Sequence, residues 1–177
     1  MGRYKKDISH VVSQEETQAM IEKAKLPRDK FIVSVLYLTG ARPSEILELK
    51  HEDIDVQDSQ LVIRLVTKKL GKARGFTIKE RLLEIQKTAP FVQHIIEYAK
   101  ITDGKLLDIN DSRIRQIVYE LSENRFCPYH FRHSRLTKLS RGGASLDELM
   151  FWKGSKDEKS VIEYLKAKPI GRKLKID

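Results

Sequence analysis

The segment TGARPSEIL, residues 39–47, places an arginine at the start of a predicted helix. Pro43 suits the first helical position, and Ile46 and Leu47 supply the apolar residues behind it. The unpaired N–H groups and the helix dipole make a helix start positive, so Ser, Thr, Asp or Asn is favoured there. Arg42 carries the opposite sign from the one that such a position favours. An arginine where anions are already attracted therefore calls for a functional explanation.

A second basic segment, YHFRHSRLTKLSR at residues 129–141, repeats cations at helical spacing. Arg132, Arg135 and Lys138 lie three residues apart, with leucines set between them. Taken alone, this segment is explained by a solvated basic helix face beside a buried stripe. The sequence contains no P-loop, H-E-x-x-H, EF-hand or G-x-S-x-G pattern. Nucleotide hydrolysis and metal-dependent proteolysis therefore have no support from motifs.

The composition favours a polyanionic partner. The 177 residues include 34 Lys and Arg against 25 Asp and Glu, a net charge of +9, and the sequence pI is about 9.6. Nucleic acid is such a partner, although a merely soluble basic surface explains the charge equally well. The longest apolar run, residues 31–38, is far shorter than the roughly 20 residues that cross a bilayer, so we expect no membrane partner. The lone Cys127 favours a reducing compartment, which predicts a cytoplasmic protein.

The periodicity of apolar residues predicts a mainly α chain with one small sheet. Ser13 and Glu16 form a capping box that starts the first helix. A stretch rich in β-branched residues predicts three short antiparallel strands, which lie near 54–56, 61–68 and 74–78. Helices are predicted at 13–25, 28–39, 43–50, 80–87, 90–100, 111–122, 129–141, 146–152 and 157–166. No repeat or long linker divides the chain, so we expect one α+β domain over residues 1–177 with a tail at 166–177.

Four motifs follow one another along the chain. They are ARPSEILELKHEDID at 41–55, a lysine-bearing hairpin, YHFRHS at 129–134 and GSKDEKSVIEYL at 154–165. In this order they resemble the catalytic domain of the tyrosine recombinases, the phage-type integrases. The resemblance implies the fold of that domain and an enzyme of a viral or plasmid mobile element that cleaves and rejoins DNA. Cleavage would pass through a 3′-phosphotyrosine, without a metal ion, ATP or another cofactor.

The resemblance also assigns roles to individual residues. Arg42 matches the family's first catalytic arginine, Arg132 the second, and His133 the histidine that follows it. Tyr164 matches the nucleophile, and its position 32 residues beyond Arg132 fits the family's spacing. With a DNA phosphate bound, the Arg42 guanidinium and the helix N–H groups would favour the same ligand. Two arginines would clamp the scissile phosphate, since a guanidinium grips two oxygens and keeps its charge.

The hairpin should supply the general acid that protonates the departing 5′ oxygen. The family's K-x-x-K-x-R pattern matches residues 69–74, which points to Lys69 and adds Lys72 as a catalytic or phosphate-binding candidate. A register slip of one residue would replace Lys69 by Lys68, because adjacent strand residues face opposite sides of a sheet. A hairpin lysine taken alone is a solvated charge or a phosphate contact.

Two positions depart from the family's pattern. Tyr129 occupies the usual position of a histidine, and Ser155 occupies that of a second histidine or a tryptophan. Both side chains can hydrogen-bond a phosphate oxygen, but neither titrates near neutral pH. The identity of the general base is therefore open. Besides Tyr129 as a positional donor, the candidates are His130, His133, Lys153 and Lys156.

Structural roles explain some of these residues without any chemistry. A tyrosine in the setting VIEYLK of Tyr164 is most often an amphipathic core residue. Glu45 and Asp53 are predicted to pair with nearby cations or to cap backbone groups.

The implied partner is double-stranded DNA, on which the family recombines as a tetramer; a monomer is compatible with the isolated chain. Members of the family usually carry an N-terminal DNA-clamping domain, which we expect to be absent from this chain. The chain would then be either a fragment or a minimal enzyme. Two rival functions remain open. One is a type IB topoisomerase-like relaxing enzyme, and the other is a non-catalytic DNA-binding module in which Arg42 and Arg132 only hold phosphates.

Overall fold

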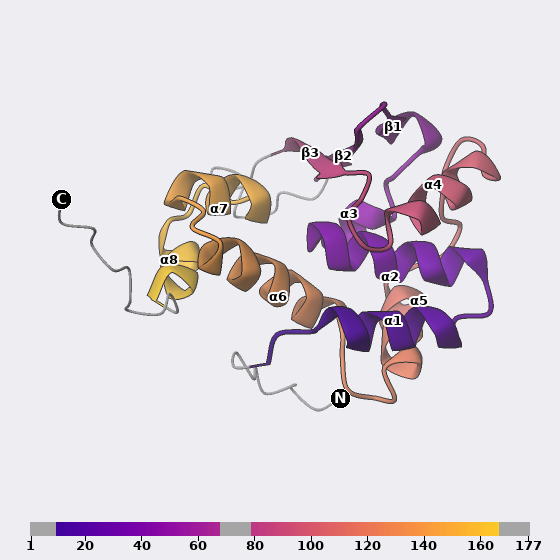
Figure 1. The fold of residues 1–177 in the computed structure, drawn as a ribbon, viewed down its shortest axis with the longest axis horizontal. Coiled ribbons are helices and arrows are strands. Elements are labelled where there is room, and N and C mark those ends of the chain that lie inside the picture. Colours follow the sequence, from indigo (N-terminus) through magenta and orange to yellow (C-terminus); the bar gives the residue numbers. More distant parts are fainter. Residues whose placement is uncertain (1–9, 68–78, 167–177) are drawn as a thin grey trace.

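The computed structural model describes residues 10–67 and 79–166. These residues form helices and one three-stranded antiparallel sheet (Figure 1), so the predicted fold class is confirmed. The elements in chain order are α1 Gln14–Lys23, α2 Pro27–Thr39, α3 Pro43–Ile46, the 3₁₀ helix η1 His51–Asp53, β1 Ile54–Val56, β2 Gln60–Val66, β3 Glu80–Gln86, α4 Val92–Lys100, α5 Asp111–Leu121, α6 Pro128–Arg141, α7 Leu146–Lys153 and α8 Lys159–Lys166.

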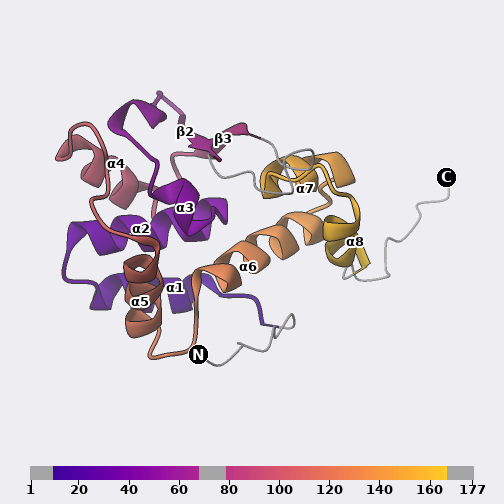
Figure 2. The same ribbon diagram turned by 180° about the vertical axis from the view of Figure 1, so that it is seen from behind.

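Helix α2 lies at the centre of the fold because it is apolar on nearly every side. It begins with Pro27 at its first position and packs against α1, α4, α5 and α6. Seen from behind in Figure 2, α5 lies in front of α2. The helix ends at Gly40, whose φ of +62° is favourable for glycine. A Cβ at Gly40 would lie 3.1 Å from the Cα atom of Arg132, so α2 and α6 meet closely at this point.

The third strand differs from the prediction. Residues 80–87 are predicted as a helix, but residues 80–86 form β3, and the strand predicted at 74–78 lies outside the described residues. The segment ERLLEIQ contains good helix formers, but in it Arg81, Leu83 and Ile85 are buried in strict alternation with exposed neighbours. Pairing with β2 imposes this period of two, so tertiary contacts override the local propensity.

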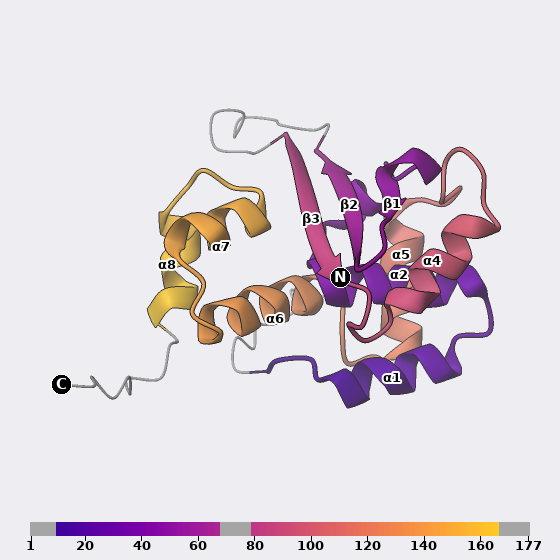
Figure 3. The same cartoon turned by 45° about the horizontal axis from the view of Figure 1, so that its top comes forward.

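The sheet has the order β1–β2–β3, and β3 is the strand nearest α7 (Figure 3). In the register, Ile63 lies opposite Leu83, and Leu65 lies opposite Arg81. All four side chains are buried. The register therefore places one arginine in a row of core residues.

Helix α3 is shorter than the predicted 43–50. The backbone of Lys50 is extended and bridges Lys105, which ends the helical run. The Asp53 carboxylate accepts the Lys50 N–H at 2.9 Å and lies 2.6 Å from Arg64 Nη2. The structural role predicted for Asp53 is confirmed. The other predicted helices are observed with ends shifted by a few residues, and the predicted tail lies outside the described residues apart from Lys166, which ends α8.

Two hydrophobic clusters hold these elements together. The main core joins α1, α2, α4 and α5 to the inner face of the sheet. A smaller cluster lies under α6, α7 and α8, and its buried side chains among the described residues are Leu136, Leu149, Val161 and Tyr164. Helix α6 leads to α7 and α8 (Figure 1) and contributes to both clusters, with Phe131 in the main core and Leu136 in the smaller one. None of the helices in the described parts of the chain is long and apolar enough to cross a membrane.

Candidate active site

Arg42 lies directly before α3 with its charge compensated by Glu45. Glu45 Oε2 accepts the Arg42 backbone N–H at 2.8 Å, and Glu45 Oε1 accepts from Arg42 Nη1 at 2.9 Å. The unfavourable sign of Arg42 at a helix start is therefore offset within the same turn. The Glu45 side chain is fully buried, whereas that of Arg42 is 34% exposed and so remains open to an anion. The structural role predicted for Glu45 is confirmed.

Arg132 is buried on α6 and caps two other helices. Its Nη1 donates to Gly40 O at the end of α2 at 2.9 Å, and its Nη2 donates to Lys153 O at the end of α7. Carbonyls at helix C-termini carry partial negative charge and favour a cation. Burial, together with the positive charge of Arg42, lowers the pKa of Arg132 to about 10. The guanidinium therefore stays charged at neutral pH.

A third arginine, Arg81, joins this group. Its Nη2 lies 2.7 Å from Glu45 Oε1, and both side chains are fully buried. Burial alone would raise the pKa of Glu45, but Arg81, Arg42 and Arg132 outweigh it and lower that pKa. One carboxylate thus faces three guanidinium groups, and the cluster has an excess of positive charge. This charge suits an anionic ligand.

Arg81 is not among the residues that the sequence motifs predict. The signal that could have found it is the alternation of Arg81 with Leu83 and Ile85, which becomes visible only when the segment is interpreted as a strand.

A cavity of about 310 Å³ opens beside two of these arginines. Arg42, Tyr129 and Arg132 line it, so three of the predicted site residues come together there. Asp111 and Arg115 from the first turns of α5 also contribute to its wall. The cavity therefore combines the two predicted phosphate-binding arginines with a phenol and a third cation.

Tyr164 lies behind this cavity, on α8. Only 2% of the residue is exposed. Its hydroxyl lies 3.1 Å from His133 Nδ1, and it also hydrogen-bonds Tyr129. Burial and the neighbouring Tyr129 raise the pKa of Tyr164, while Arg132 acts weakly in the opposite direction. Tyr129 therefore connects the predicted nucleophile to the cavity.

His133 is the candidate base that the structure brings to Tyr164. It is buried on α6, and its ring stacks on that of Tyr129 at a centroid distance of 6.4 Å. His130 faces elsewhere, because its Nδ1 accepts the backbone N–H of Cys127 at 3.1 Å at the start of α6. The Lys153 ammonium lies over the Tyr164 ring, with Nζ 5.5 Å from the ring centroid, but it donates a hydrogen bond to Ser160 O.

Ser155 and Lys156 lie in the connection between α7 and α8. The Ser155 hydroxyl accepts the backbone N–H of Asp157 at 3.2 Å and lies 3.3 Å from Ser160 Oγ. It does not line the cavity that Arg42 and Arg132 form. Lys156 is exposed in the same connection. In this arrangement Ser155 orders a turn rather than facing a phosphate.

The candidate lysines Lys68, Lys69 and Lys72 lie outside the described residues. The two ends of their segment are described. Thr67 N donates to Lys79 O at 2.8 Å, and Thr67 Oγ1 donates to Glu45 Oε1 at 2.7 Å. Thr67, the described residue directly before the lysines, therefore contacts Glu45, the same carboxylate that holds Arg42.

The chain is similar to several known recombinases in sequence and in fold. The relative "Tyrosine recombinase XerA" of Pyrococcus furiosus is 30% identical over 152 residues, covering 80% of this chain and 51% of the relative. The crystal structure of XerA recombinase superposes with a TM-score of 0.71 at 23% identity, over 88% of this chain and 60% of that chain. XerH site-specific recombinase bound to difH substrate gives a TM-score of 0.64 at 16% identity, over 85% of this chain and 47% of that chain.

The described fold is that of a tyrosine recombinase catalytic domain. Residues 10–169 match the sequence profile of the Phage integrase family. The chain belongs to the phage integrase family. It spans between 27% and 51% of the length of the curated relatives compared with it.

Proposed function

We propose that this chain is the catalytic domain of a site-specific DNA recombinase of the integrase type, which cleaves and rejoins DNA through Tyr164. One observation carries the proposal: Arg42, Arg132 and Tyr129 line one cavity, and Tyr129 hydrogen-bonds Tyr164. Membership of the phage integrase family supports it, as does the fold likeness to a recombinase bound to its DNA substrate.

The scissile phosphate would bind in the cavity between Arg42 and Arg132. Attack on a phosphodiester adds negative charge to its non-bridging oxygens, and fixed cations placed there stabilise the transition state. Arg42 is partly exposed and can turn its free donors to the phosphate. Arg132 is held in place by two backbone carbonyls, which fixes its position before DNA arrives.

The nucleophile would be the Tyr164 oxygen, with His133 as the group that takes its proton. Nδ1 of His133 lies 3.1 Å from the hydroxyl, within the range of direct proton transfer. The oxygen attacks phosphorus, a 3′-phosphotyrosyl bond forms, and the bond to the 5′ oxygen breaks. Among the candidate bases, we assign this role to His133.

The leaving 5′ oxygen would take a proton from a hairpin lysine, for which Lys69 is our assignment, with Lys68 and Lys72 as alternatives. Lysine can give up a proton, whereas arginine holds its own. The phosphotyrosyl bond conserves the energy of the cut strand. Attack on it by another 5′ hydroxyl restores a phosphodiester and releases Tyr164, so neither ATP nor a metal ion is required.

Cleavage requires Tyr164 to change its surroundings. A residue that is 2% exposed cannot reach a phosphate of a duplex, and burial raises the pKa of its hydroxyl. The buried form is thus a poor nucleophile. We infer that bound DNA draws α8 toward the cavity, where Arg132 favours the ionised oxygen. Because Tyr164 already lies beside His133 of its own chain, we expect it to act in cis.

Double-stranded DNA is the proposed partner, and strand exchange would take place in a tetramer on two sites. We propose the cytoplasm as the location, in agreement with the single cysteine.

A nicked suicide substrate tests this function. Wild-type protein should form a covalent protein–DNA adduct, whereas Tyr164→Phe should bind DNA equally and form none. Binding without an adduct would favour the non-catalytic module. Exchange between two differently labelled sites would then separate a recombinase from a relaxing enzyme, which forms the adduct but does not exchange partners.

A further inference from the structure

Arg81 is a fully buried arginine whose burial costs free energy. Its position in the register is opposite Leu65, in a row of core residues. Its Nε and Nη2 are buried and have no hydrogen-bond partner among the described residues, although Nη2 forms an ion pair with Glu45 Oε1 at 2.7 Å. A buried charge with an unpaired donor is less stable than an apolar side chain of similar volume. The fold alone therefore does not explain why an arginine occupies this position.

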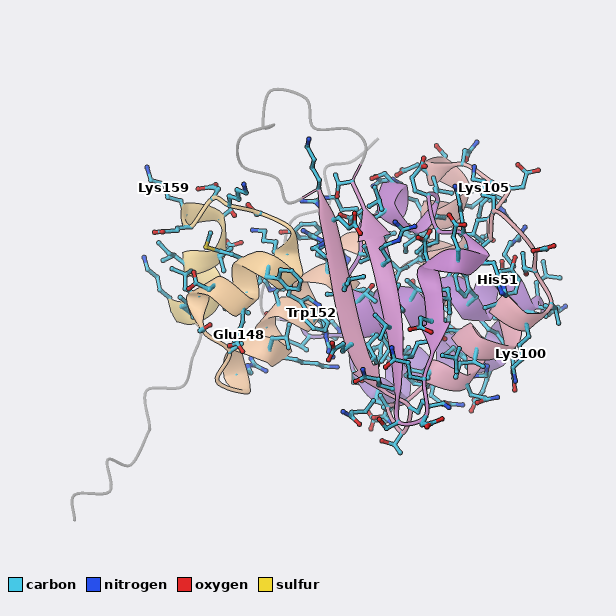
Figure 4. The ribbon with its side chains drawn as sticks, turned by 90° about the horizontal axis from the view of Figure 1, so that it is seen from above. His51, Lys100, Lys105, Glu148, Trp152 and Lys159 are labelled. Carbon is cyan, nitrogen blue, oxygen red and sulfur yellow. The ribbon has the colours of Figure 1, made fainter. Side chains whose placement is uncertain are left out.

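On one side, Arg81 contacts the end of α7. Its Nη1 donates to Trp152 O, and a Cβ at Gly154 would lie 2.8 Å from its Cζ. The next carbonyl, Lys153 O, accepts from Arg132. Two arginines thus bind two consecutive carbonyls at the C-terminus of α7. In Figure 4, Trp152 lies between α7 and β3, the strand that carries Arg81.

On its other side, Arg81 contacts the carboxylate that holds Arg42. Glu45 Oε1 lies 2.7 Å from Arg81 Nη2, 2.9 Å from Arg42 Nη1 and 2.7 Å from Thr67 Oγ1. Arg81 therefore makes two contacts. One is with Glu45, which orients Arg42, and the other is with α7, the helix that precedes α8 and Tyr164. Among the described residues it links these two parts directly.

We infer that Arg81 is a positioning residue for cleavage, which fixes the C-terminal end of α7 relative to Glu45 and thereby the connection to Tyr164. This inference rests on the proposed function. A lysine cannot replace Arg81 fully, because a single ammonium lacks the fork that reaches two acceptors on opposite sides. Misplacing a reacting group by about 1 Å costs on the order of 10²-fold in rate.

The chain contains one tryptophan, Trp152, whose carbonyl is the acceptor of Arg81. Its indole Nε1 donates to Thr39 O at 2.8 Å. Tryptophan emission and its quenching by acrylamide therefore report directly on the end of α7. Two pairs of variants test the inference with this signal and with the rate of adduct formation at saturating DNA.

The first pair is Arg81→Met and its control Arg64→Met. Arg64 on β2 also pairs with a buried carboxylate, that of Asp53 in η1, but its ion pairs do not involve Glu45 or α7. Arg81→Met should increase the quenching of Trp152 and slow adduct formation about 10-fold or more, with DNA affinity changed less than about threefold. Arg64→Met should change neither signal, and Arg81→Lys should fall between wild type and Arg81→Met.

The second pair, Gly154→Ala and Gly104→Ala, covers the case in which Arg81→Met does not fold. Both glycines have nearly equal φ, +66° and +64°, so the backbone strain is matched. Only at Gly154 would the new methyl group meet Arg81, whereas nothing lies near Gly104 within 4 Å. Gly154→Ala should therefore raise quenching and lower the rate, and Gly104→Ala should do neither.

The inference is overturned if folded Arg81→Met, or Gly154→Ala, matches its control in either signal. A change in quenching with an unchanged rate would mean that Arg81 holds α7 without serving cleavage. A wild type that forms no adduct would instead defeat the proposed function, and the quenching comparison would still show whether Arg81 holds α7.

Discussion

The main body, α1–α5 with the sheet, and the C-terminal unit, α7 and α8, are built differently. The main body has a core to which α1–α5 and one face of the sheet all contribute. The C-terminal unit shares with α6 a cluster whose buried members among the described residues are Leu136, Leu149, Val161 and Tyr164. The predicted nucleophile is thus itself one of the few residues that hold its own region in place.

The polar contacts sharpen this difference. Glu45 holds Arg42 within the main body. The end of α7 is held by hydrogen bonds that Arg81 and Arg132 donate to its carbonyls and by one that its own Trp152 donates to Thr39 O. Regions with few buried apolar contacts open at low free energy. Arg42 of the proposed phosphate site therefore lies on the main body and Arg132 on α6, whereas the proposed nucleophile lies on the unit with the smaller apolar cluster.

The largest effect is expected from the residue that joins both regions. Arg132→Lys loses the fork that binds Gly40 O and Lys153 O together, and it weakens the grip on phosphate. We expect adduct formation at saturating DNA to fall by about 10²- to 10³-fold. Single-turnover cleavage measures this loss, and a rate within fivefold of wild type, roughly 1 kcal/mol, would refute the phosphate clamp.

A matched pair of core truncations tests the independence of the two regions. Leu36 and Leu149 are both fully buried, in the main and the smaller cluster respectively. Each change to alanine should cost about 2–5 kcal/mol of local stability. Leu36→Ala should lower the global melting temperature, whereas Leu149→Ala should mainly speed hydrogen exchange in α7 and α8. Equal loss of protection throughout the chain in both variants would show that the molecule opens as one unit.

Alkaline pH should loosen the C-terminal unit selectively. Tyr164 is neutral in the fold and its pKa is raised, mainly by burial, whereas an exposed tyrosine titrates near about 10. Its stabilising contribution is complete below about pH 10 and is lost as the pH rises through the folded pKa. Quenching of Trp152 should therefore increase above about pH 10. Tyr164→Phe should remove this dependence, and a titration identical in both proteins would exclude Tyr164 as its source.

The smallest effect is expected at Ser155. The resemblance places it at a phosphate-binding position, but its hydroxyl accepts the Asp157 N–H within a turn. Ser155→Ala should lower the adduct rate less than about fivefold, roughly 1 kcal/mol. A loss near 10²-fold would mean that the α7–α8 connection rearranges on DNA to bring Ser155 to the phosphate.

The sequence predicted the residues that line the cavity better than it predicted the contacts that hold them in place. The motifs identified Arg42, Tyr129 and Arg132, and the structure brings them to one cavity. Local signals, such as the capping box of Ser13 and Glu16, were also sufficient. These features depend on residues close together in the chain or on motif spacing.

The features that the sequence did not predict depend on contacts between distant segments of the chain. Residues 80–87 favour a helix locally, but pairing with β2, in which Leu83 lies opposite Ile63, makes residues 80–86 a strand. Arg81 is not among the residues predicted from the sequence, because its partners, Glu45 and Trp152, are 36 and 71 positions away in the chain. No local pattern signals a buried charge of this kind.

The most direct test of the account is the chemical identity of the nucleophile. After reaction with a suicide substrate, nuclease and trypsin digestion should leave the peptide of residues 160–166, SVIEYLK, with a nucleotide attached to Tyr164 through its 3′ phosphate. Mass spectrometry with fragmentation locates the attachment. Modification of Tyr164 alone is expected. Attachment to Tyr129, or an adduct of undiminished yield in Tyr164→Phe, would contradict it.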